Sequence, residues 1–412
     1  WKSGDPTWHD GKGKGIIGSI NYLGDKGVNA FSFFTYNAGG DGNNIWPFVD
    51  RDDKFHYDVS KLDQWEIVFA HAQKRGVYLH FKLQENELDD HRAGAQRNHK
   101  ITPEAFDAGE TGPERRLYFR EIVARFGHHL ALNWNFGEEN TQSYEEQIAM
   151  FNYVDKVDAY DHNRVIHTFP SQQDQVYTRL LGDQSNLTGT SAQNHWRDAH
   201  RRTLQWIAAS AAAGRQWVVA NDEQNPANMG VPPDPGYQGF DGYATDGDGK
   251  SKYNLHHIRK YTLWGNLMAG GAGVEYYFGY KMLQNDLTAE DLRSRDRTWD
   301  YCRIALKFFL DLNVDLNSLH CDDTLVGTEQ GANGNWCLAD PGSLYVVYLP
   351  EGGEASIDLS DHKASYDVTW FNPRDGSIGA GSKKSVKGGK KVSLGKSKSD
   401  ASEDWTIILK KR

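Results

Sequence analysis

The sequence of 412 residues has few cysteines, few prolines and no long hydrophobic run. A membrane-spanning helix needs about 20 consecutive apolar residues, and no stretch approaches that length, so we expect no membrane span. The three cysteines, Cys302, Cys321 and Cys337, lack the paired spacing of zinc sites. Cys321 and Cys337 bracket an expected hairpin in which a disulfide is geometrically possible, whereas Cys302 is expected to be a buried free thiol.

Two common hydrolase motifs are also missing. Neither His-Glu-x-x-His nor Gly-x-Ser-x-Gly occurs, so zinc-peptidase and serine-hydrolase functions lose their main support. A loop rich in glycine and aspartate at 241–250 could chelate calcium through Asp246 and Asp248, but it lacks the spacing and the terminal Glu of an EF-hand. We therefore expect a protein without a metal or another cofactor.

The net charge indicates which binding partners to expect, and the N-terminal residues indicate the cellular location. The net charge of −10 argues against nucleic acid. The segment 383–412 is nevertheless rich in lysine, which indicates either a surface for a polyanion or a solvated face of an edge hairpin. The sequence opens at Trp1 with neither an initiator Met nor a signal peptide, so we expect a processed or trimmed form of a secreted or periplasmic protein.

Residues 16–280 alternate helical stretches with short apolar runs, a pattern typical of a parallel sheet covered by helices. Runs of β-branched and aromatic residues predict seven strands, at 28–36, 77–83, 130–136, 164–169, 187–193, 217–221 and 273–278. Helices are expected at 15–26, at 60–74, from Pro113 onward, at 201–213 and at 299–312. A closed (β/α)8 TIM-type barrel has eight strands, so we expect its first strand upstream of Trp1.

The pattern changes after residue 315. Short alternating strands are predicted at 342–349, 355–359, 366–371, 391–394 and 405–409, separated by Gly- and Pro-containing turns. This texture is typical of a small all-β sandwich. The predicted fold is therefore an α/β chain, with a catalytic barrel over 1–315 and a C-terminal β-sandwich over 316–412.

Acidic residues follow two of the predicted strands. The segment 133–140 reads NWNFGEEN, and the segment 218–225 reads VVANDEQN. Active sites of parallel barrels gather at the C-terminal ends of the strands. Glycoside cleavage needs two carboxyl groups, about 5 to 5.5 Å apart for retention of configuration and about 6.5 to 9.5 Å apart for inversion. A single glutamate at a strand end is usually a salt-bridge partner or a helix cap, but two such clusters favour catalysis.

At these two segments the chain resembles the clan A glycoside hydrolases, which have a Glu acid/base at the end of strand four and a Glu nucleophile at the end of strand seven. With one strand upstream, 137–140 falls on strand four and 221–223 on strand seven. The resemblance implies double displacement without a cofactor, with Glu223 as the nucleophile and Glu139 as the preferred acid/base. That clan commonly has Asn directly before the acid/base, whereas this chain has Gly-Glu-Glu-Asn, so Glu138 stays an alternative.

The remaining strand ends carry residues typical of a sugar site, where aromatic faces contact pyranose rings and polar side chains bind hydroxyl groups. The candidate substrate-binding residues are Asn37, Trp46, Lys82, Gln84, His167, Asn194, His195, Trp196, Glu275 and Tyr277. We expect a polysaccharide or oligosaccharide substrate. The cationic residues among these and the basic tail could bind an acidic or sulfated glycan, but the net negative charge of the chain does not support that choice, and a neutral glycan stays open.

The C-terminal segments 344–350 and 370–376 are similar to the small sandwich named the "putative collagen-binding domain", which commonly follows bacterial barrel hydrolases. A module name does not establish a ligand. The sequence as a whole predicts a secreted bacterial retaining glycosidase. Two other functions stay open, namely a non-catalytic carbohydrate-binding protein and, less favoured, a peptidase that acts on collagen-like substrates.

Overall fold

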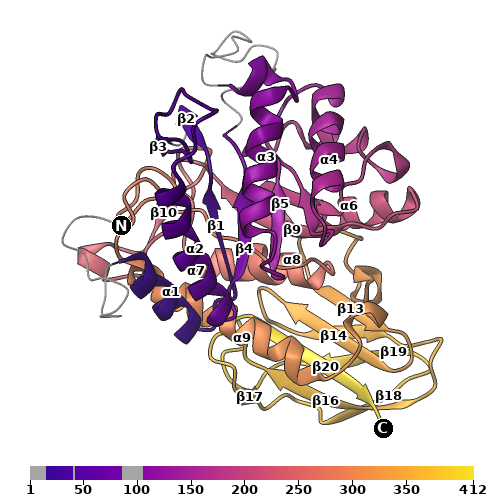
Figure 1. Cartoon of the computed structure of the whole chain (residues 1–412). Coiled ribbons are helices and arrows are strands. Elements are labelled where there is room, and N and C mark those ends of the chain that lie inside the picture. The colour runs from indigo at the N-terminus through magenta and orange to yellow at the C-terminus, as the bar shows by residue number, and fades with distance from the viewer. Residues whose placement is uncertain (1–14, 40–41, 86–104) are drawn as a thin grey trace. The chain divides into compact units, whose positions relative to one another are not determined.

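The computed structural model describes residues 15–39, 42–85 and 105–412 (Figure 1). These residues form two compact units, each built from several segments of the chain. The first unit comprises Trp1–Gln193, Ala208–Glu223 and Leu283–Arg293, and the second comprises Asn194–Ile207, Gln224–Met282 and Ser294–Arg412. The predicted domain boundary between residues 315 and 316 stays a prediction. No helix in the described part of the chain is both long and apolar enough to cross a membrane.

Parallel strands form the centre of the first unit. One sheet has the order β1-β4-β5-β6, with β1 at Ala30–Phe34, β4 at Tyr78–Lys82, β5 at Leu132–Asn135 and β6 at Asn163–Val165. A second sheet has the order β7-β8-β9, with β7 at His167–Thr168, β8 at Gly189–His195 and β9 at Val218–Asn225. A single residue, Ile166, separates β6 from β7. These strands confirm the first six of the seven that the sequence predicts.

Helices alternate with these strands, as the sequence pattern predicts. They are α1 at Ile16–Asp25, α2 at Val59–Lys74, α3 at Pro113–Phe126, α4 at Tyr144–Val157, α5 at Gln173–Thr178 and α6 at Ala199–Ala212. Helix α1 packs on α2, and α3 lies beside α4 (Figure 1). Aromatic rings join the helices to the sheet, since Phe69 of α2 lies 5.0 Å from Phe81 of β4 and Phe151 of α4 lies 4.7 Å from Phe136, between ring centroids.

Local capping explains where two of these helices begin. The Asp58 carboxylate accepts a hydrogen bond from Lys61 N at the start of α2. Ser143 and Glu146 form a reciprocal capping box at the start of α4. This second cap fixes the chain a few residues beyond the acidic end of β5, so it also limits how far the loop 136–142 can move.

An antiparallel sheet with the order β12-β13-β14-β20-β16-β17 dominates the second unit, and β18 also pairs with β16. Strands β15 and β19 form a separate pair. Their bounds are β12 His320–Cys321, β13 Trp336–Asp340, β14 Leu344–Leu349, β15 Ala355–Asp358, β16 Ser365–Phe371, β17 Ile378–Gly379, β18 Ser385–Lys387, β19 Lys391–Gly395 and β20 Trp405–Lys411. All five strands predicted after residue 315 are confirmed.

The large sheet of the second unit is buried on both faces. Val347 of β14 packs with Ile357 of β15 and Leu394 of β19 in one apolar cluster. Its neighbours in β14 point the other way, and Val346 packs in a second cluster with residues of α8, Trp264–Met268, and of the predicted helix α9, Asp296–Leu312. This burial on both sides explains why β14 is an unbroken apolar run rather than an alternating one.

The two faces of this sheet also explain why the cysteines are not bonded to each other. Cys337 lies in the cluster with β15 and β19, whereas Cys321 packs against the cluster on the opposite face. Side chains on opposite faces of a sheet cannot meet at disulfide distance, and all three cysteines are free thiols. The structure therefore does not form the disulfide that the spacing of Cys321 and Cys337 allows.

Several short elements complete the described chain. They are the hairpin β2 Asn37–Gly39 with β3 Gly42–Ile45, the pair β10 Ala244–Thr245 with β11 Lys252–Tyr253, the turn α7 Leu255–His257, the π-helix Ile258–Leu263, and the 3-10 turns Phe106–Gly109, Gly182–Gln184, Tyr237–Gly239, Leu292–Arg295, Leu316–Ser318 and Asp323–Val326.

The strand predicted at 273–278 is wrong, because no strand spans these residues. The backbone of Tyr277 is bonded by other groups instead of a sheet ladder. Its carbonyl accepts hydrogen bonds from Val231 N at 2.7 Å and from the Gln224 side chain at 2.5 Å, and its N–H is directed at Gln224 Oε1. Gly273 has φ +116°, a conformation that glycine tolerates and that a regular strand does not contain.

Candidate active site

The chain turns sharply after β5 at Gly137. This residue has φ +134°, and a Cβ atom there would lie 3.1 Å from Asn140 Nδ2 and 3.3 Å from Gln84 Cγ. Two residues later Glu139 adopts a left-handed backbone with φ +49°, which is unfavourable for a residue with a side chain. Strain of this kind persists where the surrounding structure imposes it, and it is common at functional sites.

Buried Asn140 imposes the shape of this turn. Its backbone N–H donates to His167 O at 2.7 Å, and its side-chain amide donates to Phe136 O and to Gln142 Oε1. The side-chain oxygen of Asn140, Oδ1, accepts hydrogen bonds from Gln142 N and from Gln147 Nε2. The Asn that the sequence places after the glutamate pair is therefore part of the scaffold that holds them.

Four strands bring charged side chains to one place. Lys82 Nζ at the end of β4 lies 2.8 Å from Glu138 Oε2, just beyond β5. His167 Nε2 of β7 lies 3.3 Å from Glu138 Oε1 and 3.4 Å from Glu223 Oε2 of β9. One carboxylate oxygen of Glu138, one of Glu223 and a nitrogen of His167 all lie within 4.8 Å of one another. All four side chains are buried, so their charges interact strongly.

Glu139 is a partly buried carboxyl group beside this cluster. Burial, followed by the negative charges of Glu223 and Glu138, raises the pKa of Glu139 to about 8, against smaller opposite effects of His167 and of the hydrogen bond from Gln193. Gln193 Nε2 donates to Glu139 Oε1 at 3.1 Å. Glu139 therefore carries a proton at neutral pH, which is the state that a general acid needs.

A chain of hydrogen bonds sets the position of the proton on His167. Asn135 Nδ2 donates to Ser191 Oγ at 3.1 Å, and Ser191 Oγ lies 3.2 Å from His167 Nδ1. Among the residues that the structure describes, His167 Nδ1 is the acceptor within reach of the Ser191 hydroxyl proton, because the Asn135 amide nitrogen is itself a donor. The imidazole proton then lies on Nε2, which is 3.3 Å from Glu138 and 3.4 Å from Glu223 but is not aligned for a hydrogen bond to either carboxylate.

The sequence interpretation missed two members of this site, His80 and Ser191. His80 Nε2 lies 3.0 Å from the Asn135 amide, and its other ring nitrogen lies 3.8 Å from Asp222. A signal for both existed in the sequence. His80 precedes the predicted ligand Lys82 by two residues in β4, and Ser191 precedes the predicted ligand His195 by four residues in β8, so each shares a strand face with a predicted ligand.

Three of the predicted substrate-binding residues of the first unit have structural partners. Gln84 Nε2 donates to Gln142 Oε1, and the Arg115 guanidinium donates to Gln84 Oε1. Asn37 Oδ1 accepts from Asn44 N and Ile45 N, which closes the β2–β3 hairpin. The Lys61 ammonium lies 5.2 Å from the centre of the Trp46 ring. Direct binding of substrate by these residues stays a prediction.

The other predicted ligands belong to the second unit. His195 Nε2 lies 2.8 Å from Asp246 Oδ1, and the buried Trp196 ring stacks on Tyr253 in an apolar cluster. The Tyr277 carbonyl is bonded to Gln224, as described above. The roles of Asn194, His195, Trp196, Glu275 and Tyr277 as substrate ligands stay predictions.

The loop 241–250 uses its acidic side chains for its own hydrogen bonds. Asp246 accepts a hydrogen bond from Gly247 N and contacts His195, as noted above. Asp248 accepts hydrogen bonds from Lys250 N and from both the backbone and the hydroxyl of Ser251. These bonds account for the Gly- and Asp-rich composition of the loop as a tight turn.

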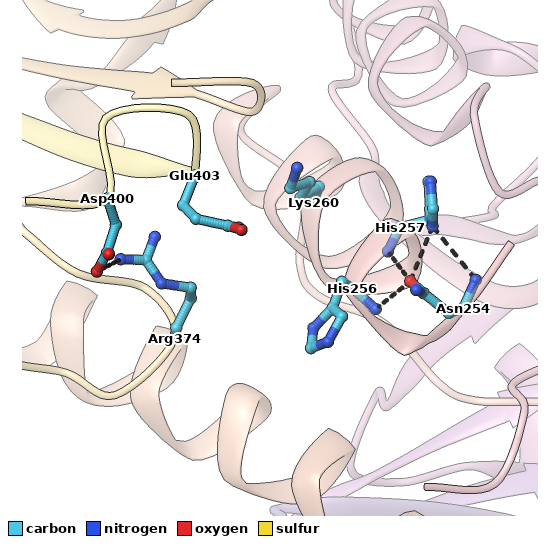
Figure 2. A pocket seen from close by; sticks show the side chains of 7 residues that line it. All are labelled: Asn254, His256, His257, Lys260, Arg374, Asp400 and Glu403. Carbon is cyan, nitrogen blue, oxygen red and sulfur yellow. Dashed lines mark hydrogen bonds and ion pairs between the residues drawn. The ribbon is translucent and has the colours of Figure 1, made fainter. Parts of the chain in front are cut away.

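An open pocket of about 470 Å³ also lies within the second unit (Figure 2). Its lining residues are Asn254, His256, His257, Lys260, Arg374, Asp400 and Glu403. Both of its fixed cations already have acidic partners, since Lys260 pairs with Glu351 and Arg374 with Asp400. None of the predicted site residues lines this pocket, so the buried carboxylates of the first unit are the stronger candidate for chemistry.

Comparisons with known proteins agree with the architecture. The family described as "Putative collagen-binding domain of a collagenase" matches residues 321–410. No curated protein matches the chain. A glycoside hydrolase family 5 structure from Bacteroides vulgatus is similar over 96% of this chain and 84% of its own, with a TM-score of 0.69 and 16% identity.

Two further solved structures have the same fold. One, described only as a glycoside hydrolase, has a TM-score of 0.67 and 13% identity, and the match covers 97% of this chain and 90% of that one. A GH30 endoxylanase from Clostridium papyrosolvens has a TM-score of 0.54 and 10% identity, over 97% of this chain and 94% of its own. The chain thus has the fold of a glycoside hydrolase with a C-terminal domain.

Proposed function

We propose that the chain is a secreted retaining glycoside hydrolase that cleaves a polysaccharide or oligosaccharide. The observation that carries this proposal is the contrast between neighbouring carboxyl groups, of which Glu138 and Glu223 are buried and Glu139 is partly buried. Glu139 has a pKa raised to about 8, whereas Glu138 and Glu223 lie 3.3 and 3.4 Å from Nε2 of His167. Carboxyl groups whose environments drive their protonation states apart are the arrangement that acid/base and nucleophile roles need.

In the proposed reaction the Glu223 carboxylate attacks the anomeric carbon while Glu139 gives its proton to the departing glycosidic oxygen. The products of this step are a glycosyl ester on Glu223 and an ionised Glu139. Forming the ester removes the negative charge of Glu223, which is one cause of the raised pKa of Glu139. The pKa of Glu139 therefore falls, and its carboxylate can take a proton from the water that hydrolyses the ester.

Glu138 is less suited to be the acid. The Lys82 ammonium lies 2.8 Å from its carboxylate, and this contact favours the charged form of Glu138. A charged carboxylate has no proton to give to a leaving group. We propose that Glu138, together with Lys82, fixes His167 beside the nucleophile, and that Glu139 is the acid/base.

The charges of the site bear on the substrate class. Lys82 is already paired with Glu138, and three glutamates converge on the same place. A substrate carboxylate or sulfate placed there would meet repulsion from these acidic groups. We therefore propose that the substrate is a neutral glycan rather than an acidic or sulfated one.

The stereochemistry of the product tests this function. We expect proton NMR of early reaction mixtures, on a substrate found by a glycan screen, to show the same anomeric configuration in the product as in the substrate. An inverted first product would overturn the retaining mechanism. Saturable glycan binding with no hydrolysis of any glycan would favour a non-catalytic binding protein.

His167 is expected to act as a positioning residue for the nucleophile. Replacement H167A removes the Nε2 proton that lies between Glu138 and Glu223, so kcat should fall by roughly 10- to 100-fold with a smaller change in KM. The acidic limb of the pH profile should move to higher pH, because the ionised form of Glu223 loses the favourable electrostatic contact with the imidazole. Steady-state kinetics across pH measure both effects.

His162 provides the matched control for this variant. It is also a buried histidine, but it contacts Asp158 and the His129 carbonyl rather than the glutamates. H162A should therefore lower thermal stability and leave the position of the acidic limb unchanged. If H162A and H167A shift the acidic limb equally, the positioning role of His167 is wrong.

A further inference from the structure

A second group of titratable side chains lies in the second unit, apart from the candidate site. His200 is at the start of α6, Cys321 is the last residue of β12, and Asp323 follows two residues later. His200 Nε2 lies 2.8 Å from Asp323 Oδ2 and 3.9 Å from Cys321 Sγ, and Cys321 Sγ lies 3.4 Å from Asp323 Oδ1. His200 and Asp323 are fully buried, whereas Cys321 is partly exposed. We refer to these three residues as the His200 cluster.

The surrounding structure holds two of these side chains in fixed orientations. His200 Nδ1 donates to the Gly265 carbonyl at 2.9 Å, and the His200 ring stacks on Trp336 with centroids 4.3 Å apart. The Asp323 oxygens accept hydrogen bonds from Gly331 N and Cys337 N, each at 3.1 Å. A histidine whose second nitrogen binds a backbone carbonyl, beside a carboxylate held by N–H groups, is the usual outer arrangement of a metal site.

Protons of the His200 cluster occupy the positions that a divalent cation bound to the three side chains would take. A backbone carbonyl only accepts, so His200 Nδ1 carries a proton, and the 2.8 Å contact between Nε2 and Asp323 Oδ2 requires one further proton between these two atoms. Burial raises the pKa of Cys321, so its thiol also carries a proton, directed at Asp323 Oδ1. Two protons thus point at one carboxylate, and a Zn²⁺ ion that displaced both would leave the net charge of this buried place unchanged.

We propose that the His200 cluster binds Zn²⁺ through His200 Nε2, Cys321 Sγ and the Asp323 carboxylate. Ordinary Zn–N, Zn–O and Zn–S bond lengths place tetrahedral ligand atoms about 3.3 to 3.5 Å apart. His200 Nε2 lies 2.8 Å from Asp323 Oδ2 and 3.9 Å from Cys321 Sγ, and these two distances need changes of only about half an ångström to reach that geometry. The 3.4 Å contact of Cys321 Sγ is with the other carboxylate oxygen, Oδ1, and one atom from each of the three side chains lies within 4.8 Å of the other two. We assign the fourth position to a water molecule.

Cys337 is not among the proposed ligands, because its side chain lies on the opposite face of the sheet. The proposed ion would join the first turn of α6 to the loop after β12, which are more than a hundred residues apart in sequence. Its role would be to stabilise the second unit, and it is independent of the proposed glycosidase activity.

Metal content and spectroscopy of the full chain test this site. After treatment with EDTA and dialysis against Zn²⁺, we expect about one tightly held Zn²⁺ per chain, and about one fewer in C321S. Co²⁺ in place of Zn²⁺ should give a thiolate-to-metal absorption band that C321S lacks. C302S is the matched control, since Cys302 is a partly buried free thiol outside the cluster, and it should retain the ion and the band.

Two measurements on the unmodified chain keep the test valid if C321S fails to fold. Calorimetry in buffers of different ionisation enthalpy should show release of about two protons per Zn²⁺ bound. Zn²⁺ should also protect Cys321, but not Cys302, from alkylation mapped by mass spectrometry. Retention of well under one ion per chain, or equal alkylation of Cys321 with and without Zn²⁺, would show that the cluster is only a buried histidine–aspartate pair.

Discussion

Replacement E223Q is expected to reduce glycan hydrolysis by about 10⁴-fold or more while the protein stays folded. Glutamine keeps the shape of Glu223 but cannot form the glycosyl ester, so the first step of the proposed reaction is lost. The amide can still contact His167, which lies 3.4 Å from the native carboxylate. The substitution therefore separates the chemical role of Glu223 from its packing role.

Initial rates on an activated aryl glycoside and on the natural glycan would measure this loss, and circular dichroism with thermal unfolding would confirm the fold. The control variant is E66Q, because Glu66 contacts His128 and His129 in the first unit and lies outside the proposed catalytic machinery. E66Q should keep nearly the full rate. Near-normal turnover by E223Q would contradict the assignment of the nucleophile.

The strands of the first unit could be predicted because each one is a short β-branched or aromatic run between helices with an apolar stripe. The run at 273–278 has the same composition but is not a strand. Its backbone forms hydrogen bonds with the Gln224 side chain and with Val231 N. Neither contact can be recognised from the residues at 273–278 themselves. Tertiary contacts of this kind override strand propensity.

The candidate site was predictable to the extent that it lies at strand ends. Glu139, Glu223 and Lys82 follow apolar runs, and the structure brings them together. Ser191 and His80 lie inside strands, where a polar residue looks like ordinary alternation, so the sequence indicates the strand face that each occupies but not its contact with His167 or Asn135. Conversely, Gln84 looks like a sugar ligand in the sequence, but its amide supports the loop after β5 through Gln142.

Replacement E139Q is expected to slow hydrolysis by about 10²- to 10⁴-fold and to remove the basic limb of the pH profile. The pKa of Glu139 is raised to about 8, so the proton is present below that pH and is lost above it. The native enzyme should therefore lose activity as pH rises through about 8. Glutamine does not titrate, so the residual rate of E139Q should not fall in this range.

The two adjacent glutamates can be distinguished by the dependence on the leaving group. An aryl glycoside with an acidic phenol needs little protonation, so E139Q should lose much less activity on it than on the natural glycan. E138Q breaks the contact with Lys82 but leaves the acid in place, so it should keep the basic limb and slow both substrates to a similar degree. If instead E138Q removes the basic limb and E139Q retains it, Glu138 is the acid/base. The role of Glu139 would then be limited to raising the pKa of Glu138 through its negative charge.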